Sequence, residues 1–198
     1  MLFDFDGPVC SLFAGYPAAG IACELLKLVR RVRGRVQPGW ERITSPHQLL
    51  LAAADDSALA RRLEGALRAA EMTAVSTATP TPGAADAIAA CTTAERRVAI
   101  VSNNCRGAIT AYLERVGLTG SVCHVEGRSP EDPRLMKPSP YVVERAIRTL
   151  GTTPAAWNDV QAGRAAGVAT VGYANKVGKA EVLRRAGADT IVTDLAAP

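Results

Sequence analysis

Two aspartates near the start of the chain have the spacing of cooperating catalytic carboxylates. Asp4 and Asp6 follow an apolar run and lead into a Gly-Pro turn at Gly7. In a strand, residues i and i+2 point to the same side, so both carboxylates would project from the carboxyl end of a short buried strand. Like charges this close raise each other's proton affinity unless a cation or hydrogen bonds hold them. The pair suits a nucleophile, a general acid/base and a divalent metal ion, and a solvated turn is the alternative interpretation.

Three later segments carry further polar groups in a recognisable order. The apolar run 98–101 ends in Ser102 and Asn103, Lys137-Pro138 precedes a helical segment, and Asp159 opens the pattern D-x-x-A-G-x-x-A-G. Together with D-x-D-G at the start, these segments resemble the four signatures of the haloacid dehalogenase superfamily, and most closely its phosphoglycolate-phosphatase-like branch. The resemblance spans nearly the whole chain, and it implies a phosphatase.

The resemblance also implies a role for each matching residue. Asp4 would attack phosphorus and form an aspartyl-phosphate, and Asp6 would act as general acid and then as general base. Ser102 would hydrogen-bond a phosphoryl oxygen. A serine or asparagine here could also be an ordinary N-cap of the following helix, and the two roles are compatible. Lys137 would place a positive charge beside the transferring group. An acid two residues after the nucleophile favours phosphoryl transfer over the halide chemistry of the dehalogenase branch.

The remaining implied contacts concern the substrate and a metal ion. Gly7 and Asn103 would contact the substrate, which would be a small phosphorylated metabolite. Mg²⁺ prefers oxygen ligands and keeps several waters, and Asp4, Asp6 and Asp159 would be its protein ligands. His47, by contrast, has no cysteine or acid at ligand spacing, so we interpret it as structural.

Composition excludes several other classes of protein. The 198 residues are 48% hydrophobic and 21% charged, and no apolar stretch reaches the ~18 residues that a membrane span needs. Five scattered cysteines without a C-x-x-C pair, and no leader-like start, indicate a reduced, cytoplasmic protein. The net charge of +4 permits an anionic substrate, and 5% aromatic residues argue against a nucleic-acid partner. The sequence carries no signal for an oligomeric state.

Strands and helices alternate after residue 80, which predicts an α/β fold with a Rossmann-like parallel sheet flanked by helices. Residues 14–79 are expected to form an inserted, all-helical cap, with helices at 21–32, from Ser45 to about Ala54, and from about Asp56 onward. The expected domains are therefore a core of residues 1–13 and 80–198, and a cap of residues 14–79. Ligands of such sheets bind at the carboxyl ends of the strands, where the signature residues lie.

The fourth signature departs from the family pattern. An apolar strand and a Gly-Asp pair normally precede its last acid, but here Trp157-Asn158 leads directly into Asp159. The missing segment would carry a central strand and the principal metal-binding acid. Residues 168–173 could instead move inward and pair with the first strand, or another chain could supply a strand. The alternative function is therefore a catalytically impaired relative that binds an anion or a partner protein.

Overall fold

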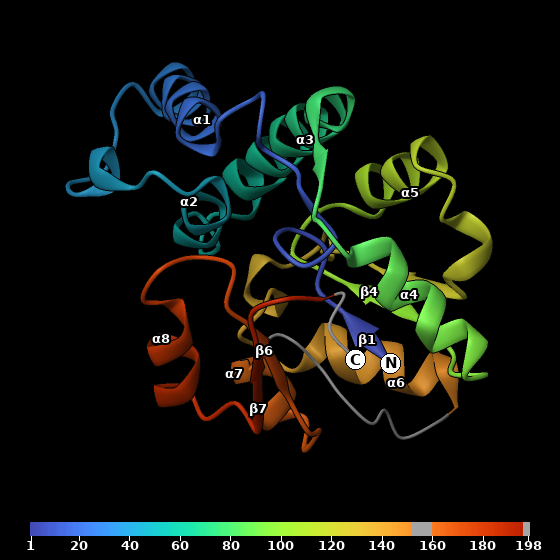
Figure 1. Ribbon diagram of the computed structural model, residues 1–198. Helices are drawn as coiled ribbons and strands as arrows, with labels where there is room; N and C mark the ends of the chain where they lie inside the picture. Colours follow the sequence, from blue (N-terminus) through green and yellow to red (C-terminus); the bar gives the residue numbers. More distant parts are fainter. Residues whose placement is uncertain (152–159, 196–198) are drawn as a thin grey trace.

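A sheet of three parallel strands forms the centre of the molecule. The computed structural model describes residues 1–151 and 160–195. The strand order is β1-β4-β5, with bounds Leu2–Phe3, Ala99–Val101 and His124–Glu126. The register places Leu2 opposite Ala99 and Ile100 opposite Val125. This parallel sheet with its flanking helices confirms the α/β fold class (Figure 1).

Helices cover both faces of the sheet because successive strand residues point to opposite sides. Phe3 and Ile100 belong to the core that includes side chains of α4 (Ala84–Thr93) and α5 (Arg106–Arg115). Leu2, Ala99 and Val101 belong to the opposite core, which includes side chains of α6 (Tyr141–Leu150) and α7 (Val160–Ala165). β1 and β4 are therefore buried on both faces, as is typical of parallel sheets, while His124 and Val125 of β5 are half-buried.

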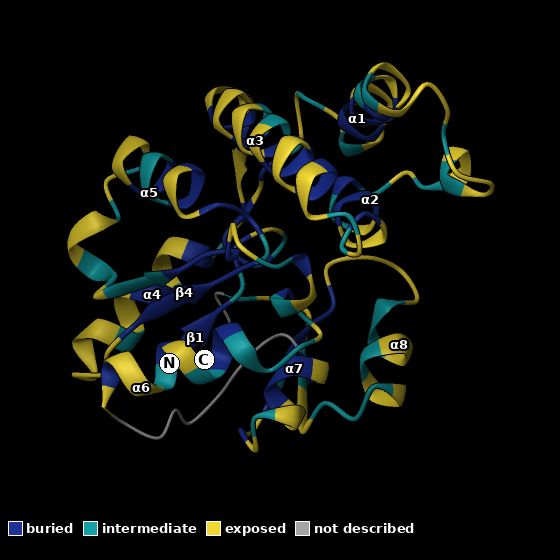
Figure 2. Ribbon diagram, turned by 180° about the vertical axis from the view of Figure 1, so that it is seen from behind, coloured by how far each residue is buried: buried dark blue, intermediate teal, exposed yellow. Residues whose placement is uncertain are grey.

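Three helices between β2 (Cys10–Ser11) and β3 (Thr79–Pro80) form a helical unit with its own apolar core. They are α1 (Ala18–Arg33), α2 (Pro46–Ala52) and α3 (Ser57–Ala74). Buried residues line the inner faces of these helices, and exposed residues line the outer faces (Figure 2). The antiparallel pair β2-β3 joins the start and the end of the unit at its base.

Local chemistry explains where these helices begin and end. The Ser45 side chain accepts a hydrogen bond from the backbone N–H of Gln48, with Pro46 in the first helical position. Asp56 caps α3 in the same way, through the backbone N–H of Leu59. Gly34 ends α1 in the left-handed conformation, at φ 73°. The helices predicted from Ser45 and from Asp56 are therefore confirmed.

The last part of the described chain forms a second, smaller parallel sheet. Strand β6 (Val171–Tyr173) pairs with β7 (Thr190–Val192), and α8 (Lys179–Arg185) connects them. The inward shift of residues 168–173 does not occur, because β6 pairs with β7 and not with β1. Within residues 1–151 and 160–195, β1 has β4 as its strand partner. The segment expected to hold the shortened fourth signature, including Asp159, lies outside the described residues.

Two smaller observations complete the fold. Strand β5 begins at His124, and the segment before it, Thr119–Ser121, forms a 3₁₀ turn. In the part of the chain that the structure describes, the helices are too short or too polar to cross a bilayer.

Candidate active site

The two aspartates lie in a tight loop directly after β1. The Asp4 carboxylate accepts a hydrogen bond from the backbone N–H of Phe5 at 2.7 Å, and the Asp6 carboxylate accepts one from Leu12 at 3.0 Å. Gly7 has φ 108°, a conformation that side-chain-bearing residues rarely adopt, so glycine allows the turn here. The Thr81 hydroxyl donates to the Gly7 carbonyl at 2.6 Å, and this bond ties the loop to the segment that follows the helical unit.

Lys137 brings a buried positive charge to the first carboxylate. Its Nζ lies 2.8 Å from Asp4 Oδ1, and its side chain is only 5% exposed. Two hydrogen bonds between Asn103 and the backbone of Lys137 hold it there: Lys137 N donates to Asn103 Oδ1 at 2.7 Å, and Asn103 Nδ2 donates to the Lys137 carbonyl at 3.1 Å. Both polar atoms of the Asn103 amide are thus engaged, and its NH₂ group has one further N–H in addition to the hydrogen bond to Lys137.

Ser102 follows β4 and is held by its neighbour Asn104. The Ser102 hydroxyl donates to Asn104 Oδ1 at 2.9 Å, and the Asn104 backbone N–H donates to Ser102 Oγ at 3.2 Å. Ser102 is 1% exposed, and its backbone N–H extends the sheet by donating to the Glu126 carbonyl. The structure therefore brings Asp4, Asn103 and Lys137 into direct contact around the strand ends, with Ser102 next to Asn103 in the same loop.

A buried ion-pair network behind the Ser102 loop was missed by sequence reasoning. The side chains of Glu71 and Arg128 are both 0% exposed. Arg128 Nη1 donates to Glu71 Oε1 at 2.8 Å, and Arg128 Nη2 donates to Glu71 Oε2 at 3.1 Å. His47 contacts Glu71 Oε1 at 3.1 Å, which agrees with its structural interpretation. Burial alone would raise the pKa of Glu71, but His47 and Arg128 outweigh it and lower that pKa to about 2. The carboxylate therefore stays charged.

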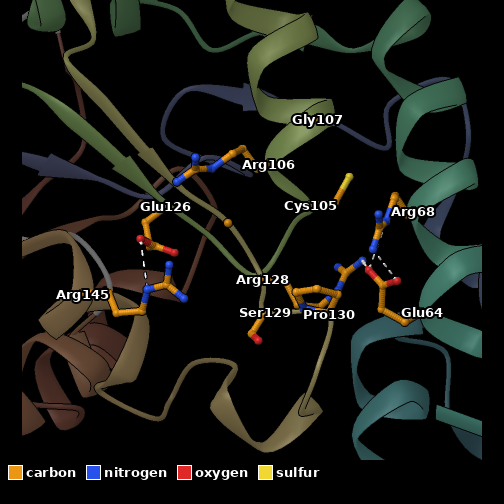
Figure 3. Close-up of a pocket in the computed structure, with 11 residues that line it drawn as sticks. Glu64, Arg68, Cys105, Arg106, Gly107, Glu126, Arg128, Ser129, Pro130 and Arg145 are labelled. Atoms are coloured by element: carbon orange, nitrogen blue, oxygen red, sulfur yellow. Dashed lines mark hydrogen bonds and ion pairs between the residues drawn. The ribbon is translucent and has the colours of Figure 1, made fainter. Parts of the chain in front are cut away.

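The same network borders a pocket of about 360 Å³ between α3 and the loops after β4 and β5 (Figure 3). Glu64 and Arg68 from α3 form one side of it, and Glu126 paired with Arg145 forms the other. Gly127 has room for no side chain, because an added Cβ would lie 2.5 Å from the backbone nitrogen of Arg106. This close approach packs the end of β5 against the start of α5.

Two lysines that the sequence analysis did not name lie near the carboxylates. Burial, followed by the nearby charge of Asp4, raises the pKa of Asp6, while Lys176 acts in the opposite direction. Burial and Lys176 lower the pKa of Lys179, and Asp4 and Asp6 oppose that change. Lys176 also lines a cavity of about 640 Å³ between the β6–α8 loop and the strand β3. The available signal was the place of Lys176 in the loop after the parallel strand β6 and of Lys179 at the start of the next helix, because ligands of such sheets bind at the carboxyl ends of the strands.

The donor set at the strand ends suits a magnesium ion only in part. Asp4 would provide a carboxylate and Asp6 its backbone carbonyl, and Mg²⁺ sites in proteins commonly use one or two carboxylates with waters completing the shell. The described residues contain no group of three histidine, cysteine, aspartate or glutamate side chains that could hold a metal ion. The predicted third ligand, Asp159, lies outside them. The Asp4 carboxylate and the Asp6 carbonyl therefore fit Mg²⁺, with the third ligand, Asp159, still a prediction.

Comparisons with known proteins agree with this geometry. A family model described as haloacid dehalogenase-like hydrolase matches residues 1–167. The comparison with curated proteins found no match.

Solved structures with the same fold include CbbY from Rhodobacter sphaeroides in complex with phosphate, at TM-score 0.68 and 18% identity over 98% of this chain and 93% of that one. L-2-haloacid dehalogenase from Xanthobacter autotrophicus has a TM-score of 0.62 and 18% identity, over 98% of this chain and 94% of the dehalogenase chain. A hydrolase from Deinococcus radiodurans with bound phosphate and sodium has a TM-score of 0.58 and 25% identity, over 98% of this chain and 90% of that hydrolase chain. Because the family model covers most of the chain and the fold agrees, this protein belongs to the haloacid dehalogenase-like hydrolases.

Proposed function

We propose that the protein is a Mg²⁺-dependent phosphatase that acts on a small phosphorylated metabolite through an aspartyl-phosphate on Asp4. The observation that carries the proposal is the buried Lys137 ammonium, 2.8 Å from Asp4 Oδ1. A cation held there faces both the nucleophile and the place where a phosphoryl group would bind. It would neutralise the negative charge that otherwise repels an anionic substrate from a carboxylate.

In the first half of the reaction, a carboxylate oxygen of Asp4 attacks phosphorus and the bond from phosphorus to the leaving oxygen breaks. Asp6 donates its proton to that leaving oxygen, and the alcohol departs. Its raised pKa favours the protonated form that this step needs. The backbone N–H groups of the loop after Ser102 would donate hydrogen bonds to the phosphoryl oxygens. The Ser102 hydroxyl would turn its proton from Asn104 Oδ1 to a phosphoryl oxygen, while its Oγ keeps the hydrogen bond from the Asn104 backbone N–H.

In the second half, a water attacks phosphorus of the aspartyl-phosphate and gives its proton to Asp6. The bond from phosphorus to the Asp4 oxygen then breaks, which releases orthophosphate and restores the Asp4 carboxylate. Asp4, the Asp6 carbonyl and Asp159 are the proposed holders of Mg²⁺, which supplies further positive charge to the transferring group when it is bound.

The acid at position 6 favours phosphatase over dehalogenase chemistry. Halide is a good leaving group that departs without a proton, whereas an alkoxide leaving group needs one. Asp6 is held by the Leu12 N–H and has a raised pKa, as a proton donor requires.

The proposed division of the chain is a core of residues 1–13 and 80–198 with a cap of residues 14–79. The apolar core that α1–α3 share supports it, and from residues 80–198 Met136 also packs into that core. Substrate selection would then lie with cap residues that close over the strand ends. A cytoplasmic location fits the five cysteines, all of which are unpaired thiols.

A second candidate function is a catalytically impaired relative that binds an anion or a partner. It is favoured by the shortened fourth signature of the sequence, which lacks the Gly-Asp pair that normally carries the principal metal-binding acid. Mg²⁺ sites rest on few carboxylates, so the loss of one weakens the site strongly.

The test is hydrolysis of an aryl phosphate across a Mg²⁺ titration, with wild type, Asp4→Asn and the matched surface control Asp86→Asn. We expect wild type and Asp86→Asn to show the same metal-dependent turnover and Asp4→Asn to show none. Chloropropionate assayed for halide release should give no activity. Wild-type rates in folded Asp4→Asn would overturn the mechanism, and no turnover in folded wild type at millimolar Mg²⁺ would support the second candidate.

A further inference from the structure

In the part of the chain that the structure describes, a buried carboxylate near the end of α3, that of Glu71, connects the helical unit to the Ser102 loop. Its side chain is 0% exposed, and His47 and Arg128 keep it charged against the effect of burial. A buried ion pair is a costly element, and its replacement by apolar residues is often neutral or stabilising. We propose that Glu71 is a positioning residue that fixes the Ser102 hydroxyl in the phosphoryl site. The inference rests on the proposed function, because Ser102 acts on the substrate there.

The contacts of Glu71 end on two consecutive residues of that loop. Glu71 Oε1 accepts from the side-chain amide of Asn104 at 3.2 Å, and Glu71 Oε2 accepts from the backbone N–H of Cys105 at 2.9 Å. Arg128 adds a third hydrogen bond to the loop, because its Nη1 donates to the Asn103 carbonyl at 2.7 Å. The ion pair thus holds three successive residues directly after Ser102.

Hydrogen bonds through Asn104 connect the Glu71 carboxylate to the Ser102 hydroxyl. An ionised carboxylate only accepts hydrogen bonds, so the NH₂ group of Asn104 must face Glu71. The Asn104 amide oxygen then faces the other way, and it accepts the Ser102 hydroxyl at 2.9 Å. The Asn104 backbone N–H also donates to Ser102 Oγ. The position of Oγ is therefore set by Asn104, and the position and orientation of Asn104 are set by Glu71.

A purely structural brace between α3 and the sheet would need only the pairing of Glu71 with Arg128. Glu64 shows what such a contact looks like. It lies on the same helix and pairs with Arg128 at 3.4 Å and with Arg68 at 2.8 Å. In the described structure it makes no hydrogen bond to residues 102–105. Glu64→Gln is therefore a matched control, with the same substitution, helix and arginine partner.

The experiment measures kcat and KM for an aryl phosphate at saturating Mg²⁺, normalised to the folded fraction from circular dichroism. We expect Glu71→Gln to lower kcat by about 10- to 100-fold, the scale of a small misplacement of a catalytic group, with little change in KM. Glu64→Gln should keep the wild-type kcat. The deciding variant is Glu71→Gln combined with Ser102→Ala. If Glu71 acts through Ser102, the double variant should be slower than Ser102→Ala alone by less than about 2-fold.

Asn104→Ala provides a second approach, because it leaves the pairing of Glu71 with Arg128 intact and removes the link to Ser102. We expect it to lower kcat as Glu71→Gln does, and its result decides the question if Glu71→Gln does not fold. A wild-type kcat in either folded variant, or an undiminished loss in the Ser102→Ala background, overturns the inference and leaves the phosphatase assignment in place. An inactive, folded wild type would instead overturn the proposed function itself, and this inference with it.

Discussion

The buried carboxylate of Glu71 should make the protein acid-labile in a way that one substitution removes. His47 and Arg128 outweigh the effect of burial and lower the Glu71 pKa to about 2, against about 4.3 in an unfolded chain. A pKa that is lower in the folded state contributes stability above the unfolded value, and this stability is lost as the pH falls through the folded value. The difference corresponds to about 3 kcal/mol of unfolding free energy at neutral pH, lost between about pH 5 and pH 2.

The perturbation is Glu71→Gln, which removes the titrating group and leaves the buried Arg128 with only its longer, 3.4 Å pairing to Glu64. At neutral pH we expect a loss of about 3–5 kcal/mol, because the closer and fully buried ion pair of Arg128 is broken. For a chain of this size, such a loss lowers Tm by about 6–20 °C. As the pH falls toward about 2, wild type loses its advantage and the gap should shrink by about 1.4 kcal/mol per pH unit at its steepest.

Urea unfolding followed by circular dichroism at about pH 7, 5, 4 and 3 measures this gap, with Glu64→Gln as the control. The control should lose much less at every pH, because Arg128 keeps its pairing with Glu71. A gap between wild type and Glu71→Gln that stays constant from about pH 7 to 3 would refute the assigned pKa. Equal stability at neutral pH would refute the network itself.

Two further predictions concern the carboxylates and the sheet edge. Asp6→Asn should slow the hydrolysis of alkyl phosphates far more than that of aryl phosphates, because aryl leaving groups need no proton. It should also remove the fall in rate with rising pH that comes from the raised Asp6 pKa. Equal losses on both substrates would count against Asp6 as the acid. The second change inserts a short apolar strand followed by Gly-Asp-Ser between Ala156 and Asp159, a segment outside the described residues. Within residues 1–151 and 160–195, β1 pairs with β4 alone, so an added strand beside β1 should raise Tm. The inserted aspartate should raise the affinity for Mg²⁺ at the same time. A lower Tm or unchanged Mg²⁺ dependence would show that the chain already compensates for its short fourth signature.

Sequence patterns predicted those parts of the fold that depend on local chemistry. Ser45 with Pro46, and Asp56 before α3, mark helix starts that need no tertiary contact, and both were located correctly. The pairing of β6 was not predictable in the same way, because a strand's partner is chosen by contacts distant in sequence. An apolar run such as 168–173 is equally suited to an inner or an outer sheet position.

The sequence motifs singled out Asp4 and Lys137 as site residues, and the structure places their side chains 2.8 Å apart, while their catalytic roles stay predictions. Glu71 was missed because helix prediction follows apolar residues, and a glutamate on the helix is normally taken as solvated. The available signal was its spacing: Glu71 lies four residues after Leu67 and eight after Leu63, on the buried stripe of α3. A charge on such a stripe requires a buried partner, but the sequence does not say that Arg128 is that partner.

The most direct test of the central claim is to trap the covalent intermediate. Wild type and Asp4→Asn are mixed with Mg²⁺ and an aryl phosphate, quenched in acid within the first turnover, and digested for mass spectrometry. We predict a phosphoryl adduct on Asp4 in wild type, which disappears on longer incubation as water hydrolyses it, and no adduct in Asp4→Asn. Sustained turnover with no adduct, or an adduct on a residue other than Asp4, would contradict the mechanism.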